Sequence, residues 1–156
     1  MHRYLLAAII VVATLISSDS YAQTALDKAT GGGWFNVGFV PTDPSAEQEA
    51  NLGFTVRKGK RGPEGHLNYH NRLTGLNVNG PVTSASRGEC PLNGLPSAIF
   101  RGNCDDGSCS FWFEVVDAGE PGKGRDEICQ YEVTKTNQGT DSNFERFLNK
   151  GNFDVR

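Results

Sequence analysis

Apolar and polar residues alternate in short runs along much of the chain. Leu52, Phe54 and Val56 are separated by small or polar residues, and Leu67 and Tyr69 show the same period of two in the next run. This period is typical of a β-strand with one buried face, because successive side chains point to opposite faces of a sheet. We therefore expect these five side chains to face a core.

The run from residue 109 to residue 116 has the strongest strand signal, because it is dense in aromatic and β-branched residues. The alternation places Phe111 and Phe113 on one face, which we expect to be buried. It places Trp112 and Glu114 on the opposite face, where Glu114 is expected to be an outward strand residue.

No segment shows the helical period over a window of about 11 residues. The 19 glycine and 7 proline residues are scattered between short apolar runs, as the turns of a many-stranded domain require. The sequence therefore predicts an all-β fold, an antiparallel sandwich or barrel of about eight to nine short strands with little or no helix.

Two stretches are harder to assign. Gly31–Gly33 are expected to make a tight bend or bulge before a strand that starts at Trp34. Residues 135–143 are predicted to be turn-like, and residues 144–148 to form either a turn of helix or a loop.

The first 22 residues form a separate segment. Arg3 precedes an apolar run from Leu5 to Ile16, which is shorter than the ~20 residues that span a bilayer. Small residues stand where signal peptidase requires them, so residues 1–22 are predicted to be a secretory signal peptide and residues 23–156 a single secreted β-domain. An uncleaved anchor is the alternative. We expect an extracellular or periplasmic location and no transmembrane segment after signal removal.

The formal net charge of the chain is −3 at pH 7. A mildly acidic surface disfavours nucleic acids and anionic membranes, since both bind cationic surfaces. A glycan, a cell-surface component or another protein stays open as the ligand, and the oligomeric state is also open.

Four cysteines are present, and in an exported chain an even number favours two disulfides. Cys104 and Cys109 flank a short Asp-Gly loop, and residues directly opposite in a hairpin have Cβ atoms close to disulfide range. That pairing leaves Cys90 and Cys129 for a second bridge. A zinc site is the alternative, although the sequence lacks a second close-spaced pair of cysteines.

Several glycine-rich motifs follow one another in order: Gly31-Gly-Gly-Trp34, Gly53-Phe54, Gly65-His-Leu-Asn-Tyr-His70, Gly75-Leu-Asn-Val78, and Asp117-Ala-Gly-Glu-Pro-Gly122 followed by Asp126. Together they resemble the post-COAP domain, a bacterial extracellular family, over roughly residues 30–156. The resemblance implies a β-rich secreted or cell-surface module with no established catalytic chemistry. The cysteines depart from the family pattern, so the disulfide assignment rests on spacing alone.

The segment 117–127 is the first candidate site. Asp117, Glu120 and Asp126 lie among glycines and a proline that let the chain curl, and calcium takes about six to eight oxygen ligands from such loops. Two basic residues interrupt the acids and the spacing is not that of an EF-hand. A hairpin turn with solvated charges is therefore the plainer alternative, and no other cofactor is expected.

Trp112 is the second candidate, as a ligand-binding residue. A tryptophan on the outer face of a sandwich would be exposed, and with Trp34 and Tyr131 it would form an aromatic platform for a sugar or a peptide. A core or otherwise covered position is the alternative for each of these rings.

Catalytic and metal motifs are weak. His66 and His70 lie on one face of a predicted strand but ~13 Å apart, too far to share a metal. The sequence contains no Gly-x-Ser-x-Gly elbow. We expect a non-enzymatic secreted or cell-surface β-module with a structural, adhesion or ligand-binding role. A calcium-stabilised binding module and a small secreted hydrolase or inhibitor, with Glu114 the carboxylate to inspect, are the alternatives.

Overall fold

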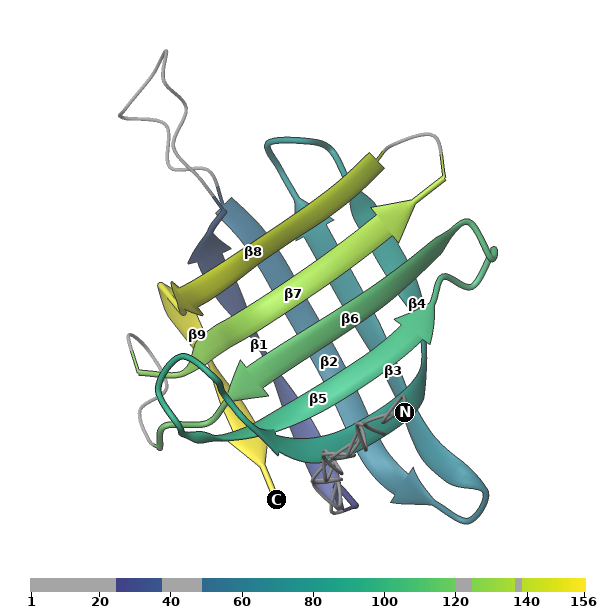
Figure 1. The fold of residues 1–156 in the computed structure, drawn as a ribbon. Helices are drawn as coiled ribbons and strands as arrows, with labels where there is room; N and C mark the ends of the chain where they lie inside the picture. Colours follow the sequence, from purple (N-terminus) through teal and green to yellow (C-terminus); the bar gives the residue numbers. More distant parts are fainter. Residues whose placement is uncertain (1–24, 38–48, 120–124, 137–138) are drawn as a thin grey trace, which may run out of the picture.

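Nine antiparallel strands form one sheet in the computed structural model, and the described residues contain no helix (Figure 1). The structure describes residues 25–37, 49–119, 125–136 and 139–156, without the side chains of 143–147, so the predicted signal peptide lies outside it. The all-β prediction is confirmed. The strands are β1 (Lys28–Asn36), β2 (Glu49–Gly59), β3 (Gly62–Asn71), β4 (Asn77–Glu89), β5 (Pro96–Asn103), β6 (Cys109–Val116), β7 (Glu127–Lys135), β8 (Gly139–Phe147) and β9 (Lys150–Val155).

The strands follow one another across the sheet from β1 to β8, and β9 returns to pair with β1. The sheet curls into a half-barrel in which β5–β8 cross over the layer that contains β1–β3 and β9 (Figure 1). Strand β4 makes the corner, because its first part pairs with β3 and its second part with β5. The register shifts between Val82 and Ser84, which is the local irregularity that such a corner needs.

The core lies between the two layers and is rich in aromatic rings. Phe113 of β6 stacks on Tyr131 of β7 and Phe100 of β5, with ring centroids 5.3 and 6.0 Å apart. Tyr69 of β3 contacts Phe113 from the other layer at 5.6 Å, so the rings join the layers. All five side chains predicted to be buried between residues 52 and 69 are buried.

The glycines of β1 do not bend the chain, contrary to expectation, because β1 starts at Lys28 and runs straight through them. Their role is close approach. A Cβ atom at Gly31 would lie 2.5 Å from the Asn152 carbonyl oxygen and 2.8 Å from the Phe153 ring. Glycine therefore lets β9 pack tightly against β1.

Strand β8 was also missed, since residues 135–143 were predicted to be turn-like and residues 144–148 a helical turn or loop. Residues 139–147 instead pair with β7 in an unbroken register, from Gly139 opposite Lys135 to Phe147 opposite Glu127. The first half of β8 is polar and has little β-propensity of its own. Pairing with β7, rather than local sequence, decides its conformation.

Both disulfides form as the spacing predicted. The hairpin disulfide joins Cys104 to Cys109, with a Cα–Cα distance of 5.0 Å, and the long disulfide joins Cys90 to Cys129, with a Cα–Cα distance of 5.9 Å. The long disulfide holds the segment between β4 and β5 against the end of the β6–β7 pair, where Cys90 and Cys129 pack on Val116 in a small second core.

Candidate functional site

The two described acids of the first candidate site hold the edge of the sheet. Strand β9 is an edge strand, and its outward N–H groups need partners. Asp126 is fully buried, and its Oδ2 accepts a hydrogen bond from the Phe153 amide at 2.6 Å. Asp117 Oδ2 accepts one from the Val155 amide at 3.1 Å. Asp117 and Asp126 therefore cap two backbone amides on the free side of β9.

The remaining oxygens of both carboxylates are also engaged by backbone. Asp126 Oδ1 accepts the Ala118 amide, and Asp117 Oδ1 accepts the Gly119 amide. Glu120 lies outside the described residues. Within the described part of the chain no group of three or more potential metal-ligating side chains gathers, so the calcium site stays a prediction without a built ligand set.

Glu114 lies on the outward face of β6, as expected, but it is buried rather than exposed to solvent. Its side chain points away from the main core, but Ser97 and Gln130 cover it, each donating a hydrogen bond of 2.6 Å to one carboxylate oxygen. Nearby, Glu127 accepts a hydrogen bond from Asn93 of the segment that the long disulfide holds. Side chains thus cover the outer face of β6 and β7 at this end.

The open part of that face carries Trp112. Its neighbours across the ladder are Arg101 on β5 and Glu132 on β7. The Arg101 guanidinium lies 5.6 Å from the centre of the indole ring. Asn103, Ser110 and Thr83 complete a shallow hollow, which we call the Trp112 groove. The indole Nε1 is buried and has no hydrogen-bond partner among the described residues.

The predicted aromatic platform does not assemble. Tyr131 is part of the core, and Trp34 lies on the outer face of β1, in the other layer. The Arg72 guanidinium covers the Trp34 ring at 4.2 Å. Trp112 is therefore the one ring of the three that lines a described groove.

A partly buried polar cluster ties β8 to the opposite layer. Asp141 Oδ2 accepts hydrogen bonds from the Tyr69 hydroxyl at 2.5 Å and the Asn71 amide at 2.7 Å, and Oδ1 accepts one from the Tyr131 hydroxyl at 3.2 Å. Burial, together with Tyr131 and the hydrogen bond to Asp141, raises the pKa of Tyr69 well above its ordinary value. The hydroxyl therefore stays protonated and acts as a donor.

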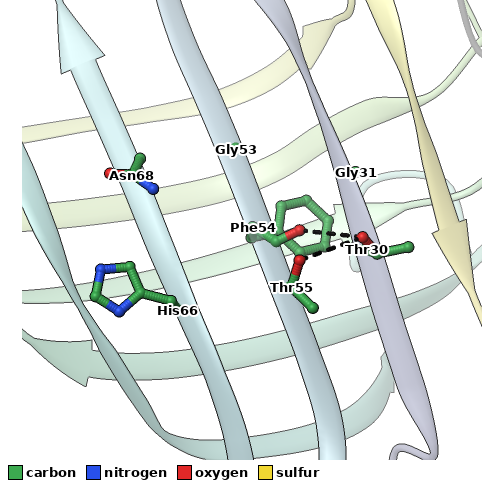
Figure 2. A pocket seen from close by; sticks show the side chains of 7 residues that line it. All are labelled: Thr30, Gly31, Gly53, Phe54, Thr55, His66 and Asn68. Carbon is green, nitrogen blue, oxygen red and sulfur yellow. Dashed lines mark hydrogen bonds between the residues drawn. The ribbon is translucent and has the colours of Figure 1, made fainter.

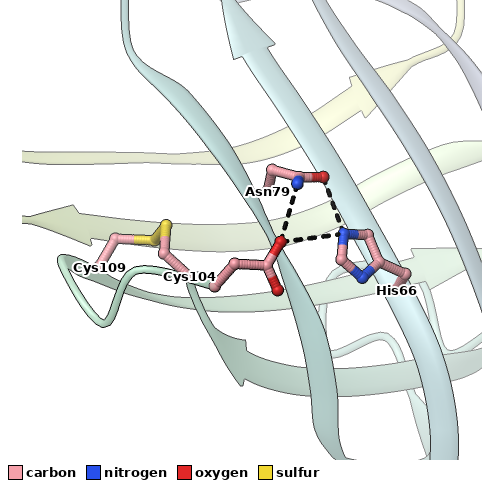
Figure 3. Close-up of polar contacts among 5 residues, drawn as sticks. His66, Asn79, Cys104 and Cys109 are labelled. Carbon is pink, nitrogen blue, oxygen red and sulfur yellow. Dashed lines mark hydrogen bonds and ion pairs between the residues drawn. A yellow bond between two sulfur atoms is a disulfide. The ribbon is translucent and has the colours of Figure 1, made fainter.

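The outer face of β3 and β4 carries a polar network that the sequence did not reveal. His66 and Asn68 point outward as predicted, opposite to Leu67 and Tyr69. His66 Nε2 lies 2.8 Å from Asn79 Oδ1, and Asn79 donates a hydrogen bond of 2.9 Å to Asp105 (Figure 3). Since Asn79 and Asp105 are 26 residues apart, no local pattern indicates this contact.

The described residues contain no helix long and apolar enough to cross a membrane. No family model, curated protein or solved structure matches the chain, so the resemblance to the post-COAP domain stays a prediction.

Proposed function

We propose that the chain is a secreted, non-enzymatic β-module that binds a carbohydrate at the Trp112 groove. The observation that carries the proposal is the set of groups around the indole ring. Arg101 and Glu132 flank it, and the Asn103 amide and Ser110 hydroxyl lie in the same hollow.

These groups suit a sugar better than an apolar ligand. The C–H face of a pyranose ring packs on an aromatic side chain, while its hydroxyls need donors and acceptors at the rim. Arg101 and the Asn103 amide supply donors at the rim of the groove, and Glu132 supplies an acceptor.

The remaining chemistry supports a binding role over catalysis. Glu114, Asp117 and Asp126 are engaged by donors of the fold itself, which leaves these carboxylates poorly placed as an acid–base pair. Two disulfides favour an oxidising compartment, in agreement with the predicted signal peptide.

Tryptophan fluorescence tests the proposal. A Trp34→Phe background leaves Trp112 as the single tryptophan, because the chain contains two. Neutral and acidic oligosaccharides are titrated into this variant, and we expect a saturable change in emission with at least one of them. Trp112→Ala in the wild-type background should weaken binding of that sugar, measured by calorimetry, about tenfold or more.

Leu92→Ala is the matched control, because it removes an exposed apolar side chain away from the groove and should leave the affinity unchanged. Equal affinity of the Trp112→Ala variant and the wild type would refute the Trp112 site. An unchanged emission with every sugar at millimolar concentration would refute carbohydrate binding there.

A further inference from the structure

We propose a second binding site on the other layer, which takes an uncharged, hydroxyl-rich segment such as a neutral oligosaccharide. The site is a shallow groove across the outer face of β1, β2 and β3, which we call the glycine groove (Figure 2). It has a volume of about 300 Å³, and Thr30, Gly53, Thr55, His66 and Asn68 line it.

The floor of the groove is backbone. Gly53 of β2 stands directly opposite Gly32 of β1, and both positions face outward. A Cβ atom at Gly53 would meet nothing within 4 Å, so the space above this residue is open. A flat ligand can therefore lie against the backbone of the sheet, between the outward side chains that precede and follow these glycines along the strands.

The wall of the groove offers hydrogen-bonding groups that the fold leaves unused. Because the Asn79 amide nitrogen donates to Asp105, its oxygen is the acceptor for His66 Nε2–H. In a neutral imidazole this leaves Nδ1 as an acceptor. Neither Nδ1 nor the Asn68 amide has a partner among the described residues, and the Thr30 and Thr55 hydroxyls lie beside them.

The hairpin disulfide keeps this wall in place. Asp105 follows Cys104 directly, and its backbone amide donates a hydrogen bond of 3.0 Å to the Asn79 carbonyl. The closed loop thus holds the Asp105 carboxylate against Asn79, and Asn79 fixes the tautomer and orientation of His66. A preorganised side chain loses little entropy when a ligand binds, which favours recognition at this position.

The strands around the groove indicate the ligand class. Strands β1, β2 and β3 are each paired on both sides, so their backbone groups are not available to an added peptide strand. Recognition has to use side chains, and those lining the groove are neutral apart from the titratable imidazole. Asp105, which lies beyond the end of the glycine groove, repels anionic polymers. An uncharged ligand with several hydroxyls satisfies these conditions.

Amide NMR on the ¹⁵N-labelled protein tests the site with a panel of neutral oligosaccharides, namely xylo-, manno-, cello- and chito-hexaose. We expect at least one of them to shift the Gly53 backbone and Asn68 side-chain amides saturably. Gly53→Val fills the open space with a residue that favours strands and should weaken that binding about tenfold or more. Arg87→Val, the control, introduces valine at an exposed position of β4 outside the groove and should leave the affinity for the oligosaccharide unchanged.

Asn79→Ala tests the positioning role. It should shift the imidazole ¹⁵N resonances of His66 from a single tautomer toward a mixture, and weaken binding about fivefold while the fold is kept. Trp112→Ala should leave the Gly53 and Asn68 shifts intact, which separates this site from the Trp112 groove. Shifts confined to the surroundings of Trp112, or wild-type affinity of the Gly53→Val variant, would overturn the proposal, and so would shifts produced only by an unstructured peptide.

Discussion

Replacing Asp126 by asparagine should strongly destabilise the fold, although the two side chains have the same shape. Asp126 is fully buried, and its two oxygens accept hydrogen bonds from the Phe153 amide at 2.6 Å and the Ala118 amide at 3.0 Å. Asparagine keeps one acceptor and turns the other into an NH2 donor that faces an N–H group. The variant loses one charge-assisted hydrogen bond and leaves a buried amide unpaired.

A hydrogen bond to a charged group contributes ~1.5–3 kcal/mol, and a buried unpaired amide costs ~1–3 kcal/mol. Both losses occur at the same contact, so the two contributions are not fully additive. We expect the free energy of unfolding to fall by about 3 kcal/mol. Asp154→Asn on β9 is the matched control. Asp154 pairs with the largely exposed Arg156, and losing such a pair should cost ~0.5 kcal/mol or less.

Guanidinium unfolding followed by tryptophan fluorescence measures both variants, with added calcium and with a chelator. The loss at Asp126 should be the same in both conditions, because the partners of the carboxylate are backbone amides. A loss below about 1 kcal/mol would refute the role assigned to Asp126 at the edge of β9. A wild type that the chelator destabilises as much as the substitution does would show instead that calcium holds the carboxylates.

Three further outcomes test other parts of the fold. Replacing the two cysteines of one disulfide by alanine should lower the free energy of unfolding, measured by denaturant unfolding, by ~4 kcal/mol for the long disulfide and by ~2 kcal/mol for the hairpin disulfide. The long disulfide contributes more because it closes the longer loop and so removes more conformational entropy from the unfolded chain. Equal losses would contradict this. Phe113→Ala should cost ~3–5 kcal/mol in the same assay, since its ring stacks on two neighbours, and a loss below ~1 kcal/mol would contradict its central position. The pKa of Tyr69 is higher in the folded than in the unfolded chain, so stability should be fully present below about pH 10 and fall as the pH rises above it. A Tyr69→Phe variant should show a shallower fall in alkaline unfolding curves, and an identical pH slope would contradict the shift.

The parts of the fold that sequence reasoning predicted are those where burial alternates along one strand. Residues 52–56 and 66–70 show the period of two because one face of the sheet packs on the core and the other meets solvent. The hairpin disulfide was predictable for a similar reason, since its partners are neighbours across one tight turn. Strand β8 lacks the pattern, and it forms because β7 offers a complete ladder.

The candidate sites were less predictable, because they depend on contacts between distant segments. Acids among glycines suggest a metal loop, but Asp126 meets Phe153 from 27 residues away and caps a strand edge instead. Glu114 was expected to face outward, and it does point away from the core. Ser97 of β5 and Gln130 of β7 cover it, and the alternation within β6 carries no information about that cover.

The positions of the acidic side chains indicate which surfaces of the fold can bind a ligand. Both edges of the half-barrel are held by carboxylates, with Asp117 and Asp126 against β9, and Asp141 reaching from β8 to the two tyrosines of the core. A carboxylate that satisfies a strand edge is a poor ligand for anything else, since displacing it would leave backbone amides unpaired. The interior strands have the opposite character, because their backbone pairs with neighbouring strands on both sides while several of their outward side chains line the two grooves. Recognition by this fold should therefore use the outer faces of β1–β3 and β5–β7, and it should depend on side chains rather than on added strands.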